Sequence, residues 1–136
     1  MNGYLLDTNV ISEVRVQRPH GGLLSWLNAQ QEQQLFLSAV TIGELQVGVE
    51  KMRRQDPVKA SEIDAWIERA LVMFQLLPMD AVCFREWARL IERKSEGLFV
   101  DAMIAATARV HRLIVATRNE RDFAEFDVRV INPFKG

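Results

Sequence analysis

Short apolar runs alternate with amphipathic segments along most of this chain, and this alternation restricts the possible fold more than any other feature. Apolar runs of strand length occur at residues 4–6, 35–37, 113–116 and 128–131, and residues 74–77 are a weaker candidate. Between these runs, apolar residues recur every three or four positions, as in helices that pack on a sheet. We therefore expect an α/β protein, a three-layer α/β/α sandwich with a central parallel sheet.

The size and composition of the chain fit one folded domain. Its 136 residues are 49% hydrophobic and 26% charged, which is ordinary for a globular protein, so we interpret residues 1–136 as a single domain. The formal net charge of -1 gives no overall attraction to a polyanion. Binding of a nucleic acid would need a local basic patch or a bound cation. The candidates for such a patch are Arg53, Arg54, Arg118 and Arg121, each of which is ordinarily explained as a solvated surface charge.

The remaining composition excludes several kinds of protein. Cys83 is the only cysteine, which rules out an internal disulfide and a zinc site built from cysteines, and its apolar helical surroundings predict a buried, inert thiol. We expect His20 at a turn and His111 near a helix end, as surface or capping residues. No signal-peptide pattern occurs, and no apolar stretch approaches the roughly 18 residues of a membrane span. We therefore expect a cytoplasmic protein that does not interact with membranes.

Residues 4–9, Tyr-Leu-Leu-Asp-Thr-Asn, form an apolar run that meets a carboxylate and then two turn-forming residues. Asp7 is thus expected at the carboxyl end of the first strand, the edge at which open parallel sheets bind their ligands. The structural alternative is an Asp that only starts the next helix, although Thr8 or Asn9 would cap that helix without Asp7. Asp7 needs partners to indicate a functional site.

Further polar residues are expected at the same edge. Glu44 lies in the first turn of the helix after the second strand, Asp101 opens an alanine-rich helix, and Asn119 and Asp122 follow a later strand. Each has a structural explanation: residues 41–44 match a capping box, Asp101 is favoured by the helix dipole, and Asn119 with Asp122 resembles a helix cap. Alone, none of them indicates function.

Taken together, the acids predict a cation site. Carboxylates within a few Å repel by on the order of 1 to 4 kcal/mol per pair and raise one another's pKa values, and a bound cation removes this cost. Oxygen ligands select a hard ion, and a site with few carboxylates suits Mg²⁺, or alternatively Mn²⁺. Such an ion polarises a phosphoryl oxygen and lowers the pKa of a bound water. An acidic pocket of this kind would accept a phosphodiester despite the net charge.

These residues resemble the motifs of the PIN-domain family, and specifically the VapC-type toxins of bacterial toxin-antitoxin pairs. The similar segments are residues 5–13, 38–45, 101–108 and 117–123, which match in order, spacing and total length. The resemblance implies a PIN-like fold and a Mg²⁺-dependent endoribonuclease that cleaves RNA until a cognate antitoxin blocks it. It further implies a homodimer, and a hydrophobic groove for an antitoxin segment that the helices around Trp26 and Trp66 would supply.

The resemblance also implies roles for the site residues. By the family pattern, Asp7 and Asp101 bind the metal directly, Glu44 completes the acidic cluster, and Asn119 or Asp122 occupies the fourth position. Many nuclease relatives have Asp where this chain has Asn119, which leaves the number of metal ions open. Hydrogen bonds around the site are implied for Thr8, Ser12 and Thr117.

Two other functions fit parts of the pattern. A phosphatase of the haloacid dehalogenase type also has an Asp after the first strand, but it needs a second acid where this chain has Asn9 and usually a downstream Lys, for which no convincing counterpart lies between Glu44 and Asp101. The other alternative is a PIN-like module that binds nucleic acid or a partner without cleaving it. The presence of Asp7 with Glu44 and Asp101 argues against lost catalysis. The RNA target cannot be read from the sequence, since RNA recognition depends on fold and unpaired bases.

Overall fold

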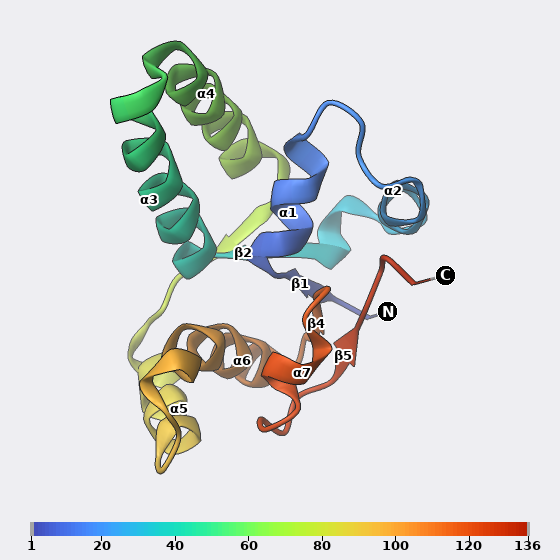
Figure 1. Ribbon diagram of the computed structural model, residues 1–136. Coiled ribbons are helices and arrows are strands. Elements are labelled where there is room, and N and C mark those ends of the chain that lie inside the picture. The colour runs from blue at the N-terminus through green and yellow to red at the C-terminus, as the bar shows by residue number, and fades with distance from the viewer. Residues whose placement is uncertain (1, 136) are drawn as a thin grey trace.

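Five short strands form one parallel sheet in the spatial order β3-β2-β1-β4-β5 (Figure 1). The structure is a computed structural model and describes residues 2–135. The strands are β1 Tyr4–Leu6, β2 Leu35–Ser38, β3 Gln75–Leu77, β4 Ile114–Ala116 and β5 Val130–Ile131. The central strand β1 pairs with β2 through Leu5 and Phe36, and with β4 through Leu5 and Val115. All the strand pairs are parallel, as the alternation of strands and helices predicts.

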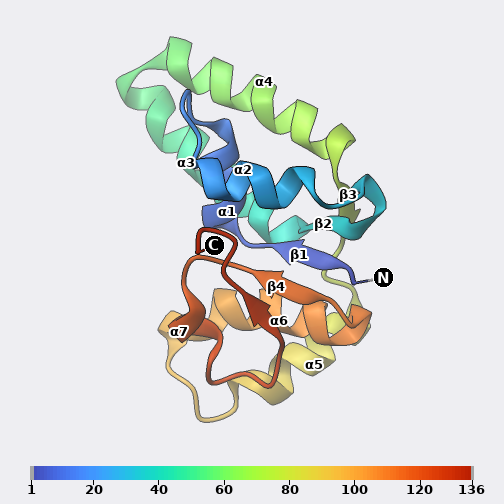
Figure 2. The ribbon, with the colours of Figure 1, turned by 90° about the vertical axis from the view of Figure 1, so that its right-hand side faces the viewer.

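Helices cover both faces of the sheet. They are α1 Thr8–Arg15, α2 Gly21–Asn28, α3 Ala39–Gln55, α4 Pro57–Met73, α5 Ala81–Ile91, α6 Phe99–His111 and α7 Glu120–Phe123, with 3-10 turns at Glu32–Gln34 and Glu96–Leu98. Figures 1 and 2 show α1 to α4 on one side of the sheet and α5 to α7 on the other. The predicted α/β/α sandwich is confirmed.

Two apolar cores, one on each face, hold the sheet between the helices. Successive side chains of a strand point to opposite faces, and accordingly Leu6 joins the core under α1 to α4 while Leu5 joins the core under α5 and α6. Both leucines are fully buried, and burial of such a side chain contributes about 1.5–3 kcal/mol. The buried alanines of α6, among them Ala105 and Ala108, allow this helix to lie close to the sheet. The strand that leads to Asp7 is therefore anchored on both sides.

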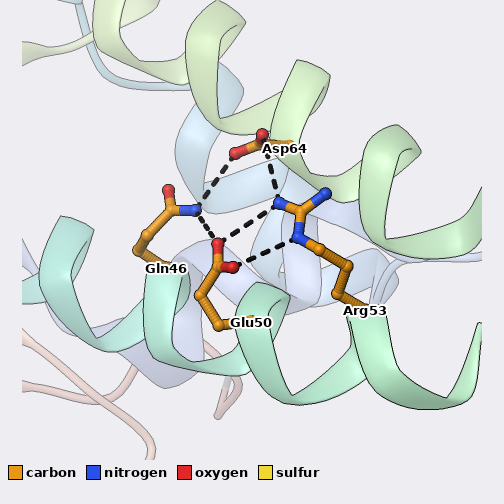
Figure 3. A network of polar contacts seen from close by, with 4 residues as sticks. All are labelled: Gln46, Glu50, Arg53 and Asp64. Carbon is orange, nitrogen blue, oxygen red and sulfur yellow. Dashed lines mark hydrogen bonds and ion pairs between the residues drawn. The ribbon is translucent and has the colours of Figure 1, made fainter. Parts of the chain in front are cut away.

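Helices α3 and α4 form a hairpin that a polar network ties together (Figure 3). Arg53 Nε donates to Glu50 Oε1 at 3.1 Å, and Arg53 Nη2 lies 3.7 Å from Asp64 Oδ2 on α4. Gln46 Nε2 donates to Glu50 Oε2 at 2.8 Å and to Asp64 Oδ1 at 3.3 Å. The guanidinium of Arg53 is thus committed to two carboxylates. Exposed pairs of this kind contribute at most about 1 kcal/mol each.

Several single-residue expectations are also met. His20 caps α2, since its Nδ1 accepts a 3.1 Å hydrogen bond from the backbone N–H of Leu23. His111 is the last residue of α6. Cys83 is a buried free thiol, and burial raises its pKa.

Within residues 2–135, no helix combines the length and the apolarity that crossing a membrane requires.

Candidate active site

The carboxyl ends of the central strands meet at one edge of the sheet, as parallel pairing requires. Asp7 directly follows β1, Ser38 ends β2 and Thr117 directly follows β4, with β1 between the other two. The chain runs from β1 to β2 on one side and returns to β4 on the other, so Asp7 stands where the strand order reverses. Ligands of open α/β sheets bind at such a point.

The carboxylate of Asp7 is buried, with only 6% of the residue exposed, and three hydrogen bonds hold it. Its Oδ1 accepts from the backbone N–H of Thr8 at 2.8 Å, and its Oδ2 accepts from Thr117 Oγ1 at 2.8 Å and from Asn9 Nδ2 at 3.1 Å. Asp7 is also the N-cap of α1. The expectation that Thr8 or Asn9 caps this helix is therefore wrong, because α1 already begins at Thr8.

Glu44 is not part of a capping box, so the structural interpretation of residues 41–44 is also wrong. Ser38 caps α3 instead, through a 3.0 Å hydrogen bond from the N–H of Val40 to Ser38 Oγ, and the helix begins at Ala39. Glu44 consequently lies beyond the first turn of α3, and its Oε1 accepts a 2.6 Å hydrogen bond from Thr8 Oγ1. A Glu placed this way links α3 to the loop that contains Asp7.

Asp101 and Asp122 reach the same edge from the other face of the sheet. Asp101 lies in the first turn of α6, which begins at Phe99, and Asp122 lies in α7. Burial, followed by the negative charges of Asp7, Asp122 and Glu44, raises the pKa of Asp101 to about 6. The four carboxylates therefore share one electrostatic environment, although they come from four different segments of the chain.

Burial also raises the pKa of Asp7. The hydrogen bonds from Thr117 and from the backbone N–H of Thr8 act in the opposite direction, and the charges of Glu44 and Asp122 add to the increase. A cation among these carboxylates would lower the pKa values of Asp7 and Asp101 again, because a positive charge stabilises the ionised form.

The two candidates for the fourth position have different surroundings in the structure. Asn119 precedes α7, its side chain makes no capping hydrogen bond, and its backbone N–H donates to Thr117 Oγ1 at 3.0 Å. The side chain whose charge acts on Asp7 and Asp101 is that of Asp122. Asn119 therefore lies beside the acidic cluster on an exposed loop, and Asp122 belongs to it.

The three expected hydrogen-bonding residues differ in their placement. Thr8 bonds to Glu44, and Thr117 bonds to Asp7, as expected. Ser12 is half-buried on α1, and its side chain makes no hydrogen bond in the part of the chain that the structure describes. Sequence reasoning missed Asn9, whose amide bonds to both Asp7 and Thr117. Its position two residues after Asp7, in the same turn, is the sequence feature that could have identified it.

The donor set fits a hard divalent cation. The carboxylates of Asp7, Glu44, Asp101 and Asp122 supply only oxygen, and neither cysteine nor histidine takes part in the interactions of this cluster. Oxygen donors of this kind suit Mg²⁺ or Mn²⁺. Among residues 2–135, no three acidic, histidine or cysteine side chains already lie close enough to enclose an ion. The acids are thus near enough to repel one another but are not drawn together.

A hollow of about 330 Å³ opens beside the acidic cluster, and residues 118–122 line it. Arg118 lies in this hollow, where its Nη2 is 3.5 Å from Glu13 Oε1 and its guanidinium lies 3.9 Å from the ring centroid of Phe134. Arg121 is exposed and makes no ion pair with any residue from 2 to 135. Two arginines, Arg118 and Arg121, therefore line the same hollow as Asp122.

This fold, with acids gathered at the carboxyl edge of a parallel sheet, defines an α/β protein that brings carboxylates from four segments of the chain to one edge of the sheet. The PIN domain family model matches residues 4–129, so the chain belongs to the PIN-domain family. The resemblance to VapC-type toxins within that family is confirmed by the relatives that the chain matches.

These relatives align over almost their full length. The chain is 37% identical to plasmid stability protein StbB of Pseudomonas syringae pv. tomato, with 96% of this chain and 98% of StbB covered. It is 34% identical both to VapC ribonuclease Y4jK of Sinorhizobium fredii and to toxin FitB of Neisseria gonorrhoeae, with 96% of this chain and 97% of each relative covered.

Solved structures agree with this assignment. FitAcB from Neisseria gonorrhoeae superposes with a TM-score of 0.85 at 32% identity and covers 98% of this chain and 99% of the matched chain. A toxin-antitoxin complex from Klebsiella pneumoniae superposes with a TM-score of 0.70 at 28% identity, covering 96% and 98%.

Proposed function

We propose that this protein is a Mg²⁺-dependent endoribonuclease, the toxin of a toxin-antitoxin pair. The observation that carries the proposal is the convergence of Asp7, Glu44, Asp101 and Asp122 at one sheet edge, where the charges of Glu44 and Asp122 raise the pKa values of both Asp7 and Asp101. Relatives named VapC ribonuclease and toxin FitB, each matched over nearly the whole chain, support the same activity.

In this proposal Asp7 and Asp101 hold the cation directly, and Glu44 and Asp122 complete its negative surroundings. When bound, Mg²⁺ or Mn²⁺ supplies Lewis-acid chemistry, since it polarises a phosphoryl oxygen and lowers the pKa of a coordinated water. Hydrogen bonds within the chain orient two of these carboxylates and offset part of the effect of burial on Asp7. Thr117 and the N–H of Thr8 stabilise the charged form of Asp7, and the hydroxyl of Thr8 fixes Glu44.

The RNA backbone approaches a negatively charged pocket, so nearby cations have to offset the repulsion. Arg121, exposed in the hollow next to Asp122, is available for a phosphate contact. Arg53 is not, because Glu50 and Asp64 already neutralise it. The basic residues that matter for substrate binding are therefore expected beside α7 and not on the α3–α4 hairpin.

The proposed antitoxin partner has an apolar surface to occupy. A groove of about 550 Å³ runs between α2 and the end of α4, and its apolar lining includes Leu24, Leu27 and Met73. The two helices around Trp26 and Trp66 border it, but these tryptophans pack half-buried against the core and do not line the groove. We propose that an apolar segment of the antitoxin lies here, as solved relatives are toxin-antitoxin complexes. A homodimer stays a prediction from the family resemblance, and a cytoplasmic location stays a prediction from the sequence composition.

Cleavage of a structured RNA by the purified protein tests this proposal. We expect cleavage with Mg²⁺, none after addition of EDTA, and none by the Asp7→Asn variant. The matched control is Asp56→Asn, which changes an exposed capping residue of α4 to another good N-cap and should cleave like wild type. Cleavage that persists in Asp7→Asn would refute the site. Binding of RNA without any cleavage by wild type would identify a silent PIN-like module.

A further inference from the structure

We propose that Asn9 is a positioning residue, which orients the carboxylate of Asp7 and ties the loop after β4 to it. Asn9 lies in the first turn of α1 and is half-buried. The catalytic part of this inference depends on the proposed function, because it concerns Asp7 as a ligand of the cation. The structural part, a link between α1 and the loop at residues 117–119, does not depend on it.

The side-chain NH₂ group of Asn9 contacts two oxygen atoms inside the site. Its Nδ2 donates to Asp7 Oδ2 at 3.1 Å and to Thr117 Oγ1 at 3.2 Å. Thr117 Oγ1 in turn donates to Asp7 Oδ2 at 2.8 Å. The three side chains therefore form a closed triangle, in which two different donors reach the same carboxylate oxygen.

The carbonyl oxygen of the same amide faces the other way and holds the main chain. Asn9 Oδ1 accepts a 3.0 Å hydrogen bond from the backbone N–H of Arg118. This contact joins the start of α1 to the loop that leads into α7, across 109 positions of the sequence. Since α7 contains Asp122, Asn9 connects the segment of Asp7 to the segment of a second acid.

The partners fix the orientation of the amide. If its oxygen and nitrogen were exchanged, the oxygen would face the carboxylate of Asp7, and the NH₂ group would face the N–H of Arg118. Both contacts would then be repulsive. No other side chain of this length supplies an N–H donor on one side and a carbonyl acceptor on the other, because Asp lacks the donor and Ser or Thr has a single hydroxyl.

The expected consequence of these contacts is a fixed orientation of the Asp7 carboxylate. A carboxylate has about four lone-pair positions, and hydrogen bonds from Thr8, Asn9 and Thr117 occupy three of those of Asp7. The direction that stays open for a cation is thus fixed by its neighbours. Loss of Asn9 would let the carboxylate rotate and would free the loop after β4.

The test uses two substitutions that separate these contacts. Asn9→Ala removes all three hydrogen bonds, whereas Asn9→Asp keeps the acceptor for Arg118 but loses the NH₂ group that contacts Asp7 and Thr117. The matched control is Gln17→Ala, which removes an exposed amide after α1. Four quantities are measured: kcat and KM for RNA cleavage, Mn²⁺ affinity by titration, and hydrogen exchange of the Arg118 amide in metal-free protein.

We expect both Asn9 variants to lower kcat or Mn²⁺ affinity by about 10- to 100-fold, the usual cost of removing a partner that orients a metal ligand. KM for RNA should change by no more than about twofold, since Asn9 contributes to the reacting centre and not to uniform binding. The Arg118 amide should exchange faster in Asn9→Ala and at the wild-type rate in Asn9→Asp. Gln17→Ala should match wild type in all four quantities.

The outcomes distinguish this inference from the proposed function. If wild type cleaves RNA and Asn9→Ala does so with unchanged kcat and unchanged Mn²⁺ affinity, the positioning role is refuted. If wild type does not cleave, the proposed function fails, and exchange at Arg118 still decides whether Asn9 holds the loop. Equal exchange in wild type and Asn9→Ala would refute that link. A rise in KM alone would assign Asn9 to substrate binding and would also contradict the inference.

Discussion

The hydroxyl of Thr8 donates a 2.6 Å hydrogen bond to Glu44 Oε1 and so joins the first residue of α1 to α3. The backbone N–H of Thr8 donates at the same time to Asp7 Oδ1 at 2.8 Å. Thr8 therefore positions two acids: Asp7, which directly follows β1, and Glu44, which lies on the helix that follows β2. The carboxylate of Glu44 is exposed, so without this contact it would be free to move into solvent.

Replacement of Thr8 separates its two contacts. Thr8→Val keeps the shape and the backbone N–H but removes the hydroxyl, and we expect about a 10-fold loss of Mg²⁺ affinity from the freed Glu44. Thr8→Ser keeps a hydroxyl and should bind Mg²⁺ nearly as well as wild type. Calorimetric titration measures both. Equal affinity for the Val and Ser variants would show that the hydrogen bond to Glu44 has no role in cation binding.

The raised pKa of Asp101 predicts how cleavage depends on pH. Cation binding requires ionised carboxylates, and burial with the charges of Asp7, Asp122 and Glu44 raises the pKa of Asp101 to about 6. Mg²⁺ affinity and cleavage should therefore fall as the pH decreases through about 6. Assays at constant ionic strength between pH 5 and 8 measure this. An unchanged affinity down to pH 5 would contradict the assigned cluster.

Metal-free protein should show the opposite dependence of stability on pH. Because the folded state holds a proton on Asp101 more tightly than the unfolded state, the free energy of unfolding falls as the pH rises from 3.8 towards about 6. Asp101→Asn mimics the protonated side chain. At pH 7.5 without metal it should melt higher than wild type, by about 3 °C for each 1 kcal/mol of repulsion removed.

Mg²⁺ provides the control for this stability measurement. Addition of saturating Mg²⁺ should raise the melting temperature of wild type, because a ligand that binds the folded state stabilises it. It should have little effect on Asp101→Asn. A variant that melts lower than wild type in metal-free buffer would mean that Asp101 has a stabilising partner instead of repelling neighbours.

Two arginines test where the substrate binds. Arg121→Ala should weaken RNA binding several-fold and reduce the slope of log affinity against log salt by about 0.7 to 1, the loss of one phosphate contact. Arg53→Ala, at a guanidinium already paired with Glu50 and Asp64 (Figure 3), should leave RNA affinity unchanged. Filter binding over a range of salt concentrations compares them. Equal losses of RNA affinity in the two variants would indicate an effect of overall charge, without a phosphate contact at Arg121.

The fold and the location of the acids were predictable because both depend on simple geometry. Alternating apolar runs predict parallel strands, and parallel strands place every carboxyl end, including those before Asp7 and Thr117, at one edge. Helix starts were less predictable. Ser38 and Thr41, or Asp7 and Asn9, are equally good caps in isolation, and only the end of the preceding strand decides between them.

The hydrogen bonds within the site were beyond the reach of sequence patterns. The amide of Asn9 meets Thr117 and the N–H of Arg118 only because β1 and β4 are neighbours in the sheet, and no local spacing encodes that pairing. The choice between Asn119 and Asp122 was likewise open, since both follow the same strand. The direction of α7 brings Asp122 towards Asp7 and Asp101.

The most direct measurement is anomalous diffraction from crystals grown with Mn²⁺. We predict an anomalous peak within ligand distance of carboxylate oxygens of Asp7 and Asp101, and no such peak in crystals of Asp7→Asn grown under the same conditions. A peak elsewhere on the molecule, or Mn²⁺ bound equally well by Asp7→Asn, would contradict the assignment of one cation site to these acids.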